Sequence, residues 1–259
     1  MQTRQGFFTL LALALLTASA FAARAEPDAA PGFDTVEGRF PPPDGFSRLA
    51  AAPGSFGAYL RALPLEPGRP PVHLYDGREK GNQSAHAAVI DFDVGARDLQ
   101  QCADAVMRLR AEYLRAVGRS DEVCFRTAGG ERLRFSGRAS GWRRYLNRVF
   151  AYANTASLAR QLAAVDDPLR IEVGDVFVEP AKGGRYGHAV IVVDVAANAS
   201  GARAFLLAQS YMPAQDIHVL VNPENPKSPW YEATADGALD TPEWRFPPGS
   251  LRRFRPGGC

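Results

Sequence analysis

The run from Gly187 to Val195 is almost unbroken in β-branched and other apolar residues, with His188 at its start. Such a run is typical of a strand that is buried on both faces, because a strand with one wet face alternates apolar and polar residues. The chain must therefore form a sheet and cover both of its sides. Shorter apolar runs predict further strands over 87–90, 173–178, 204–209 and 217–221.

Helices are expected mainly ahead of this sheet. The clearest runs from Asp98 to about Val117, where apolar residues recur every three or four positions and Asp98 with Gln101 can form a capping box. Others are expected over 56–62, capped by Ser55, and over 140–153 and 157–165. Helices in the first half and strands in the second predict an α+β domain.

The charge of the chain does not indicate a nucleic-acid partner. Arg4 and Arg24 account for the net charge of +2, since the other 28 of the 30 basic residues are matched by 28 acidic ones. Nucleic-acid binding depends on an excess of basic side chains on one surface. We therefore expect no nucleic-acid partner.

The first 25 residues have the pattern of an export signal. A short segment with Arg4 precedes an apolar stretch from Phe7 to about Ala22, and the small-residue site Ala23-Arg24-Ala25 follows. We expect a cleaved signal peptide over 1–25 and a mature protein that is periplasmic or secreted. No stable membrane insertion is expected once the signal is removed.

After the expected signal peptide, the composition of the chain predicts a linker over 26–40, a single α+β domain over 41–252 and a disordered tail over 253–259. The three cysteines are odd in number, so at least one is free or pairs with another chain. One interpretation is a disulfide between Cys102 and Cys124, which leaves Cys259 in the tail.

Cys102 is the expected nucleophile. It falls in the first turn of the predicted helix, where free N–H groups and the helix dipole stabilise the thiolate that attacks a carbonyl. Cys102 also lies on the apolar face of that helix, so the alternative is a small side chain that fills space in the core. His188, at the start of the most apolar strand, is the expected base, although a lone histidine on such a strand is usually structural.

The order of a Gly174-Asp175 strand, a turn at Lys182-Gly183-Gly184, and then Gly187-His188 resembles the second half of papain-like hydrolases of the NlpC type. Those proteins carry a cysteine on a helix, a histidine base on a strand, and on the next strand a polar residue that orients the imidazole. The resemblance implies a papain-like fold, with a helix-borne Cys102 packed on an antiparallel sheet and with His188 as the base.

On the same resemblance, Gln209 orients the imidazole, and Ser210 and Asp216 are its substitutes. Backbone N–H groups at the start of the Cys102 helix, together with Gln101, are expected to stabilise the oxyanion. His86, which precedes a strand beside this helix, is an alternative base.

A longer resemblance covers roughly residues 40 to 250. The segments Asp91–Gly95, Asp98–Leu114, Gly187-His188-Ala189, Ala208–Gln215 and Thr241–Trp244 resemble the uncharacterised bacterial family filed as domain of unknown function 4846. This resemblance implies an exported bacterial protein and supplies no activity.

The sequence thus predicts an exported cysteine hydrolase, an amidase or peptidase acting on cell-wall peptide. The alternative is a non-catalytic cell-envelope module of the same fold that binds a wall peptide or glycan through Trp142, Trp230 or Tyr211. No cofactor is expected. No metal is expected either, because paired cysteines and histidines within four residues of each other do not occur.

Overall fold

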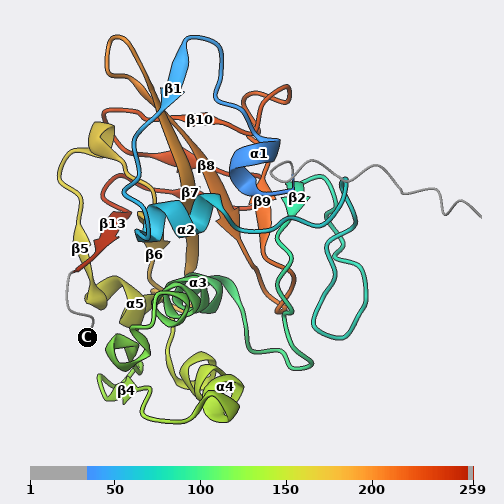
Figure 1. Ribbon diagram of the computed structural model, residues 1–259, viewed down its shortest axis with the longest axis vertical. Coiled ribbons are helices and arrows are strands. Elements are labelled where there is room, and N and C mark those ends of the chain that lie inside the picture. Colours follow the sequence, from blue (N-terminus) through green and yellow to red (C-terminus); the bar gives the residue numbers. More distant parts are fainter. Residues whose placement is uncertain (1–33, 256–258) are drawn as a thin grey trace, which may run out of the picture. The chain divides into compact units, whose positions relative to one another are not determined.

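In the computed structural model, which describes residues 34–255 and Cys259, the apolar run forms β7 (His188–Asn198) at the centre of a nine-stranded sheet (Figure 1). The main strand order is β2-β9-β8-β7-β6-β13-β5, and the pairings are antiparallel. The flanking strands are β2 (His86–Val89), β9 (His218–Leu220), β8 (Arg203–Gln209), β6 (Val176–Glu179), β13 (Leu251–Phe254) and β5 (Leu162–Ala164).

Six further strands are present in the described residues, two of them in this sheet and four in separate hairpins. β1 (Phe46–Arg48) pairs with the far end of β7, and β10 (Tyr231–Glu232) pairs with β8. Two separate hairpins consist of β3 (Cys124–Arg126) with β4 (Arg132–Arg134), and of β11 (Leu239–Asp240) with β12 (Arg245–Phe246).

The helices are α1 (Val36–Arg39), α2 (Phe56–Arg61), α3 (Cys102–Ala116), α4 (Trp142–Tyr152) and α5 (Thr155–Gln161), with 3-10 turns at Ser120–Glu122, Ala139–Gly141 and Pro168–Arg170. Helices combined with an antiparallel sheet confirm the predicted α+β class. None of the helices in the described part of the chain has the length and hydropathy of a membrane span.

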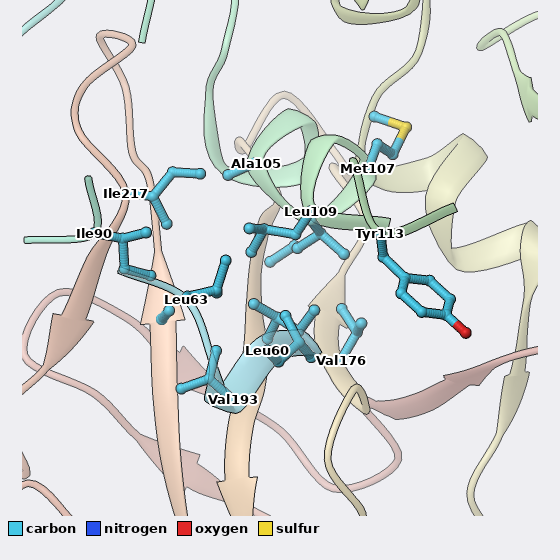
Figure 2. Close-up of a cluster of buried hydrophobic side chains, with 14 of the residues drawn as sticks. Leu60, Leu63, Ile90, Ala105, Met107, Leu109, Tyr113, Val176, Val193 and Ile217 are labelled. Carbon is cyan, nitrogen blue, oxygen red and sulfur yellow. The ribbon is translucent and has the colours of Figure 1, made fainter. Parts of the chain in front are cut away.

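Successive residues of β7 face two different hydrophobic cores. Ala189 and Ile191 join the core that contains α2 and α3, whereas Val190 and Val192 join a second core that contains Phe246 of β12. The apolar run is therefore explained by burial on both faces of the strand. Figure 2 shows the first core, where Leu60 of α2, Leu109 of α3 and Val193 of β7 gather.

A β-bulge in β7 holds a buried ion cluster. The register against β8 shifts between Val192 and Asp194, so that β7 carries one extra residue. The fully buried Asp194 carboxylate accepts hydrogen bonds from Arg61 Nε at 2.5 Å and from Arg48 Nε at 2.7 Å. This cluster ties α2 and β1 to the central strand, and its pairing is what makes a charge tolerable at this depth.

Helix α3 begins at Cys102, four residues later than predicted. Gln101 is the N-cap, and its N–H donates to Asp104 Oδ2 at 3.1 Å. Asp98 instead accepts hydrogen bonds from the Gln101 side chain at 2.9 Å and from the Ala214 N–H at 2.7 Å. Cys102 is consequently the first helical residue.

The folded part begins earlier and ends later than predicted. Helix α1 lies within the expected linker over 26–40, and its Val36 is buried and hydrogen-bonded through its N–H to the Leu63 carbonyl at 3.1 Å. Strand β13 extends to Phe254, into the expected tail over 253–259, because it pairs with both β6 and β5. The predicted signal peptide over 1–25 lies outside the described residues.

Cys259 forms a disulfide with Cys124, across 135 residues and with 5.4 Å between the Cα atoms. The prediction that Cys259 belongs to a disordered tail is therefore wrong. So is the interpretation of a Cys102–Cys124 disulfide, since Cys102 is a free, buried thiol. The disulfide anchors the C-terminal end of the chain to the β3–β4 hairpin.

Loss of this disulfide is expected to lower the free energy of unfolding by about 2–4 kcal/mol, because it removes a covalent restraint on a long loop of the unfolded chain. Chemical denaturation of Cys259→Ser, compared with the oxidised parent, measures the loss. Dithiothreitol should destabilise the parent to the level of the variant and leave the variant unchanged. Equal stabilities of the oxidised parent and the variant would contradict the expectation.

Candidate functional site

Cys102 lies where the N-terminus of α3 meets the start of β7. Its Sγ atom is 4.0 Å from the carbonyl oxygen of Gly187, and the Ala189 N–H also points toward the sulfur. The thiol therefore contacts backbone groups on both sides of His188. Strand β8, the neighbour of β7, ends at Gln209, so this part of β7 lies beyond the end of β8.

The resting state of Cys102 is a neutral thiol. Burial raises the pKa of Cys102 to about 12, with a further increase from the charge of Asp104. The N–H groups of Cys102, Ala103 and Ala189 lower the pKa but do not offset the burial. The N–H groups at the helix N-terminus thus favour the thiolate as expected, but the side chain is only 5% exposed and desolvation outweighs them.

The His188 imidazole is fully buried among aromatic rings. The ring centres of Tyr211, Trp244 and Phe246 lie 4.9, 5.2 and 5.7 Å from its own. Burial lowers the pKa of His188 to about 4, against a smaller opposing effect of its hydrogen bond with Gln209. At neutral pH the ring is therefore uncharged and able to accept a proton.

Gln209 lies beside His188 on the neighbouring strand. Its Oε1 is 2.8 Å from His188 Nε2, so the structure places the residue expected to orient the imidazole within hydrogen-bond distance of it. On the other side of the amide, Gln209 Nε2 donates to Glu243 Oε2 at 2.8 Å and lies 3.3 Å from His218 Nε2. The same Glu243 oxygen accepts from Lys80 Nζ at 2.5 Å.

The second ring nitrogen of His188, Nδ1, is buried and has no hydrogen-bond partner among the described residues. No hydrogen bond joins it to Cys102 in this state. Buried polar atoms are rarely left unpaired, so a free ring nitrogen needs an explanation. A base that must accept a proton during a reaction is one such explanation.

Cys102 lines a cavity of about 320 Å³. Asp104, Thr155, Tyr186 and Met212 also form its wall. Burial raises the pKa of Asp104 well above its usual range, and its Oδ1 has no hydrogen-bond partner among the described residues.

Gly187 belongs to the same wall and is closely packed from behind. A Cβ atom at this position would lie 2.4 Å from Thr155 Oγ1, 2.4 Å from the Glu179 carbonyl oxygen and 2.5 Å from the Ala181 nitrogen. Only glycine lets β7 begin this close to α5 and to the segment that follows β6. The position of His188 relative to Cys102 depends on this approach.

The other expected site residues lie away from the imidazole. The Gln101 side chain donates to Asp98, which occupies its amide group. Ser210 Oγ lies 2.8 Å from the Gln215 carbonyl oxygen and 3.0 Å from that of Gln100, so it holds a loop in place. Asp216 accepts a hydrogen bond from the His73 N–H at 2.7 Å.

His86, the alternative base, lies near His218. Its Nε2 is 2.9 Å from the Pro70 carbonyl oxygen, and its ring centre is 6.1 Å from that of His218. Among the described residues, no hydrogen bond or ring contact joins it to Cys102. Within residues 34–255 and Cys259, no group of three His, Cys, Asp or Glu side chains is arranged to hold a metal ion.

Three polar residues of the site were not predicted from the sequence: Lys80, His218 and Glu243. They come from separate loops and a short strand, with no periodic pattern that links them. A signal did exist for Lys80, because the chain has only three lysines among its 30 basic residues. Glu243 lies in the Thr241–Trp244 segment, where the resemblance to a known family was evident but indicated no role.

The comparisons with known proteins identify a family without an assigned activity. The family model described as a domain of unknown function (4846) matches residues 36–144 and 136–253. No curated protein and no protein of solved structure shows significant similarity to the chain.

Proposed function

The chain belongs to the family of the domain of unknown function 4846, and from its site we propose that it is an exported cysteine hydrolase with a papain-like arrangement. It cleaves an amide bond in cell-wall peptide. One observation carries the proposal. The sulfur of Cys102 contacts the backbone on both sides of His188, whose Nδ1 is free while Nε2 faces Gln209.

In the acylation step the Cys102 sulfur attacks the carbonyl carbon of the substrate, and its proton passes to His188 Nδ1. The tetrahedral intermediate collapses when the C–N bond breaks. The nitrogen takes the proton from His188 and leaves as an amine. A thioester on Cys102 remains, and the imidazole is neutral again.

In the deacylation step the same imidazole removes a proton from water, and the oxygen attacks the thioester carbon. Collapse of this intermediate breaks the C–S bond, and Cys102 recovers its proton from His188. The product is a carboxylic acid. The proton passes between neutral groups at rest, so an initial thiolate is not required.

The oxyanion formed in both steps lies next to the N-terminus of α3. The N–H groups of Cys102 and Ala103 already act on the sulfur and are suited to stabilise negative charge beside it. The Gln101 N–H already donates to Asp104, and the Gln101 side-chain amide already donates to Asp98. We therefore assign the oxyanion site to the backbone of Cys102 and Ala103 rather than to Gln101.

Product analysis tests this proposal directly. The purified protein is incubated with a panel of cell-wall stem peptides, and new amines and carboxylates are identified by mass spectrometry. The proposal predicts that one amide bond is cut and that a thioester on Cys102 is trapped by acid quenching. A folded protein that cleaves none of these amides and forms no adduct would contradict it.

The pH dependence follows from the lowered pKa of His188. Since Nδ1 must be free to accept the proton, kcat/KM is expected to fall as the pH drops through about 4 and to be constant between about 5 and 8. Above neutral pH, kcat/KM stays constant up to about pH 8 because the Cys102 thiol, with a pKa of about 12, remains protonated. A midpoint near 6.5, the usual value for histidine, would contradict a base buried in this way. Circular dichroism at each pH separates loss of activity from unfolding.

A non-catalytic binding module is the second candidate, and the neutral, buried thiol favours it. Of its three expected contact residues, however, Trp142 and Trp230 are buried, with their indole N–H groups donated to Glu112 and to the Pro41 carbonyl. Trp142 is thus a core residue rather than a contact surface, whereas the buried Trp230 also lines a separate cavity of about 440 Å³. Ligand binding without acylation of Cys102 would favour this candidate.

A further inference from the structure

We propose that Glu243 is a positioning residue for the base: it sets the orientation of the Gln209 amide and thereby leaves His188 Nδ1, rather than Nε2, without a hydrogen. The catalytic consequence rests on the proposed function. The orientation of the Gln209 amide follows from hydrogen bonds among four side chains, Glu243, Gln209, His188 and His218.

The hydrogen of His218 can be assigned from one contact. His218 Nδ1 lies 2.9 Å from the Asp216 carbonyl oxygen, and a carbonyl oxygen can only accept. Nδ1 must therefore carry the hydrogen. Burial keeps this ring neutral, with its pKa lowered to about 3, so His218 Nε2 is a bare acceptor at neutral pH.

Two acceptors then fix the Gln209 amide. Its nitrogen lies 2.8 Å from Glu243 Oε2 and 3.3 Å from His218 Nε2, and an amide nitrogen has two hydrogens to donate. If the amide were flipped, its oxygen would face the Glu243 carboxylate and the lone pair of His218 Nε2, and neither of these can donate a hydrogen bond. The Gln209 oxygen must therefore face His188.

The tautomer of His188 follows. Gln209 Oε1 can only accept, so the His188 Nε2 that lies 2.8 Å away must carry the hydrogen. In a neutral ring this leaves Nδ1 bare, and Nδ1 is the ring nitrogen that has no partner. His188 and His218 are therefore in opposite tautomers, with Gln209 between them.

Lys80 is the counter-ion of Glu243. Its Nζ is 2.5 Å from Glu243 Oε2, and Asn82 Nδ2 donates to Oε1 at 3.2 Å. A charged carboxylate is a stronger acceptor for the Gln209 amide than a neutral group. The ion pair with Glu243 explains how a lysine can be buried beside Gln209.

The first test is ¹⁵N NMR of the histidine rings in the unmodified protein near pH 7, with His188→Gln and His218→Gln used only to assign the signals. We expect His188 to be protonated at Nε2 and His218 at Nδ1. The same tautomer in both rings, or an Nδ1 hydrogen on His188, would overturn the proposal. This readout needs no substrate, so it decides the hydrogen-bond argument even if the proposed hydrolysis fails.

A matched pair of double variants tests the role of Glu243. Lys80→Met with Glu243→Met removes the acceptor and leaves no unpaired buried charge, whereas Lys80→Met with Glu243→Gln keeps an acceptor oxygen. In the first, we expect a mixture of His188 tautomers and acylation of Cys102 slowed about tenfold or more. In the second, we expect the single Nε2–H tautomer and a smaller loss. Identical tautomers and rates in both variants would overturn the role of Glu243.

Discussion

Replacement of Cys102 by alanine is expected to lower the rate of amide hydrolysis by a factor of about 10³ or more, because no other group can carry the acyl intermediate. The fold should survive the change. The sulfur contacts backbone groups, among them the Gly187 carbonyl at 4.0 Å, and loss of a small buried side chain costs about 1 kcal/mol. Steady-state hydrolysis and thermal unfolding of the variant give the two measurements.

Cys102→Ser is the matched variant, since it keeps the size of the side chain and removes only the sulfur. It should show the same loss of activity. Turnover close to that of the parent in a folded Cys102→Ala protein would remove the thiol from the mechanism. If the Cys102→Ala protein does not fold, Cys102 is a residue of the core and the loss of activity says nothing about a nucleophile.

Replacement of Asp194 by alanine is expected to lower the free energy of unfolding by about 3–5 kcal/mol, the largest effect on stability that we predict. The change leaves the Arg61 guanidinium, which is 5% exposed, without its 2.5 Å partner. It also removes an acceptor from Arg48 and from the Val195 N–H. Urea denaturation measures the effect.

Asp93→Ala is the matched control, because Asp93 and Arg143 form an ion pair of the same length, 2.5 Å, at the surface. Water solvates the remaining arginine there, so the expected loss is below about 1 kcal/mol. Similar losses of unfolding free energy in Asp194→Ala and Asp93→Ala would contradict the claim that burial makes the Asp194 ion cluster important for stability. The double variant Arg61→Met with Asp194→Leu should recover part of the stability, because it removes the buried Arg61 charge together with its partner.

The sequence predicted the elements that have strong local signals. Ser55 caps α2 as expected, with its side chain accepting from the Ala58 N–H at 3.2 Å, and the long apolar run forms β7. The start of α3 was misplaced because Asp98 and Gln101 satisfy the same local pattern as Gln101 and Asp104. Which pair caps the helix depends on Asp98 being held by the distant Ala214 N–H.

Elements without a local pattern could not be predicted. Strand β13 has four residues, and its strand structure comes from pairing with β6 on one side and β5 on the other. The Cys124–Cys259 disulfide joins positions 135 residues apart, and spacing alone does not determine how three cysteines pair.

The site was predicted in part, for similar reasons. Helix position and the resemblance to papain-like hydrolases singled out Cys102, His188 and Gln209 as candidates, and the structure brings Gln209 within hydrogen-bond distance of His188. The protonation states of Cys102 and His188 could not be predicted, because burial dominates both pKa values and depends on the complete fold. Glu243 contacts Gln209, and Lys80 pairs with Glu243, from loops far apart in the sequence that no periodicity marks.

The most direct test of the central claim is the pre-steady-state reaction with an activated ester, 4-nitrophenyl acetate, at pH 7. The account predicts a burst of one equivalent of nitrophenol and one acetyl group on Cys102, with the burst slowed about 10²-fold or more in His188→Ala. His86→Ala, which changes a neighbouring histidine outside the proposed pair, should keep the rate of the parent. The same burst rate in His188→Ala as in the parent, or acetylation elsewhere than at Cys102, would contradict the proposed nucleophile and base.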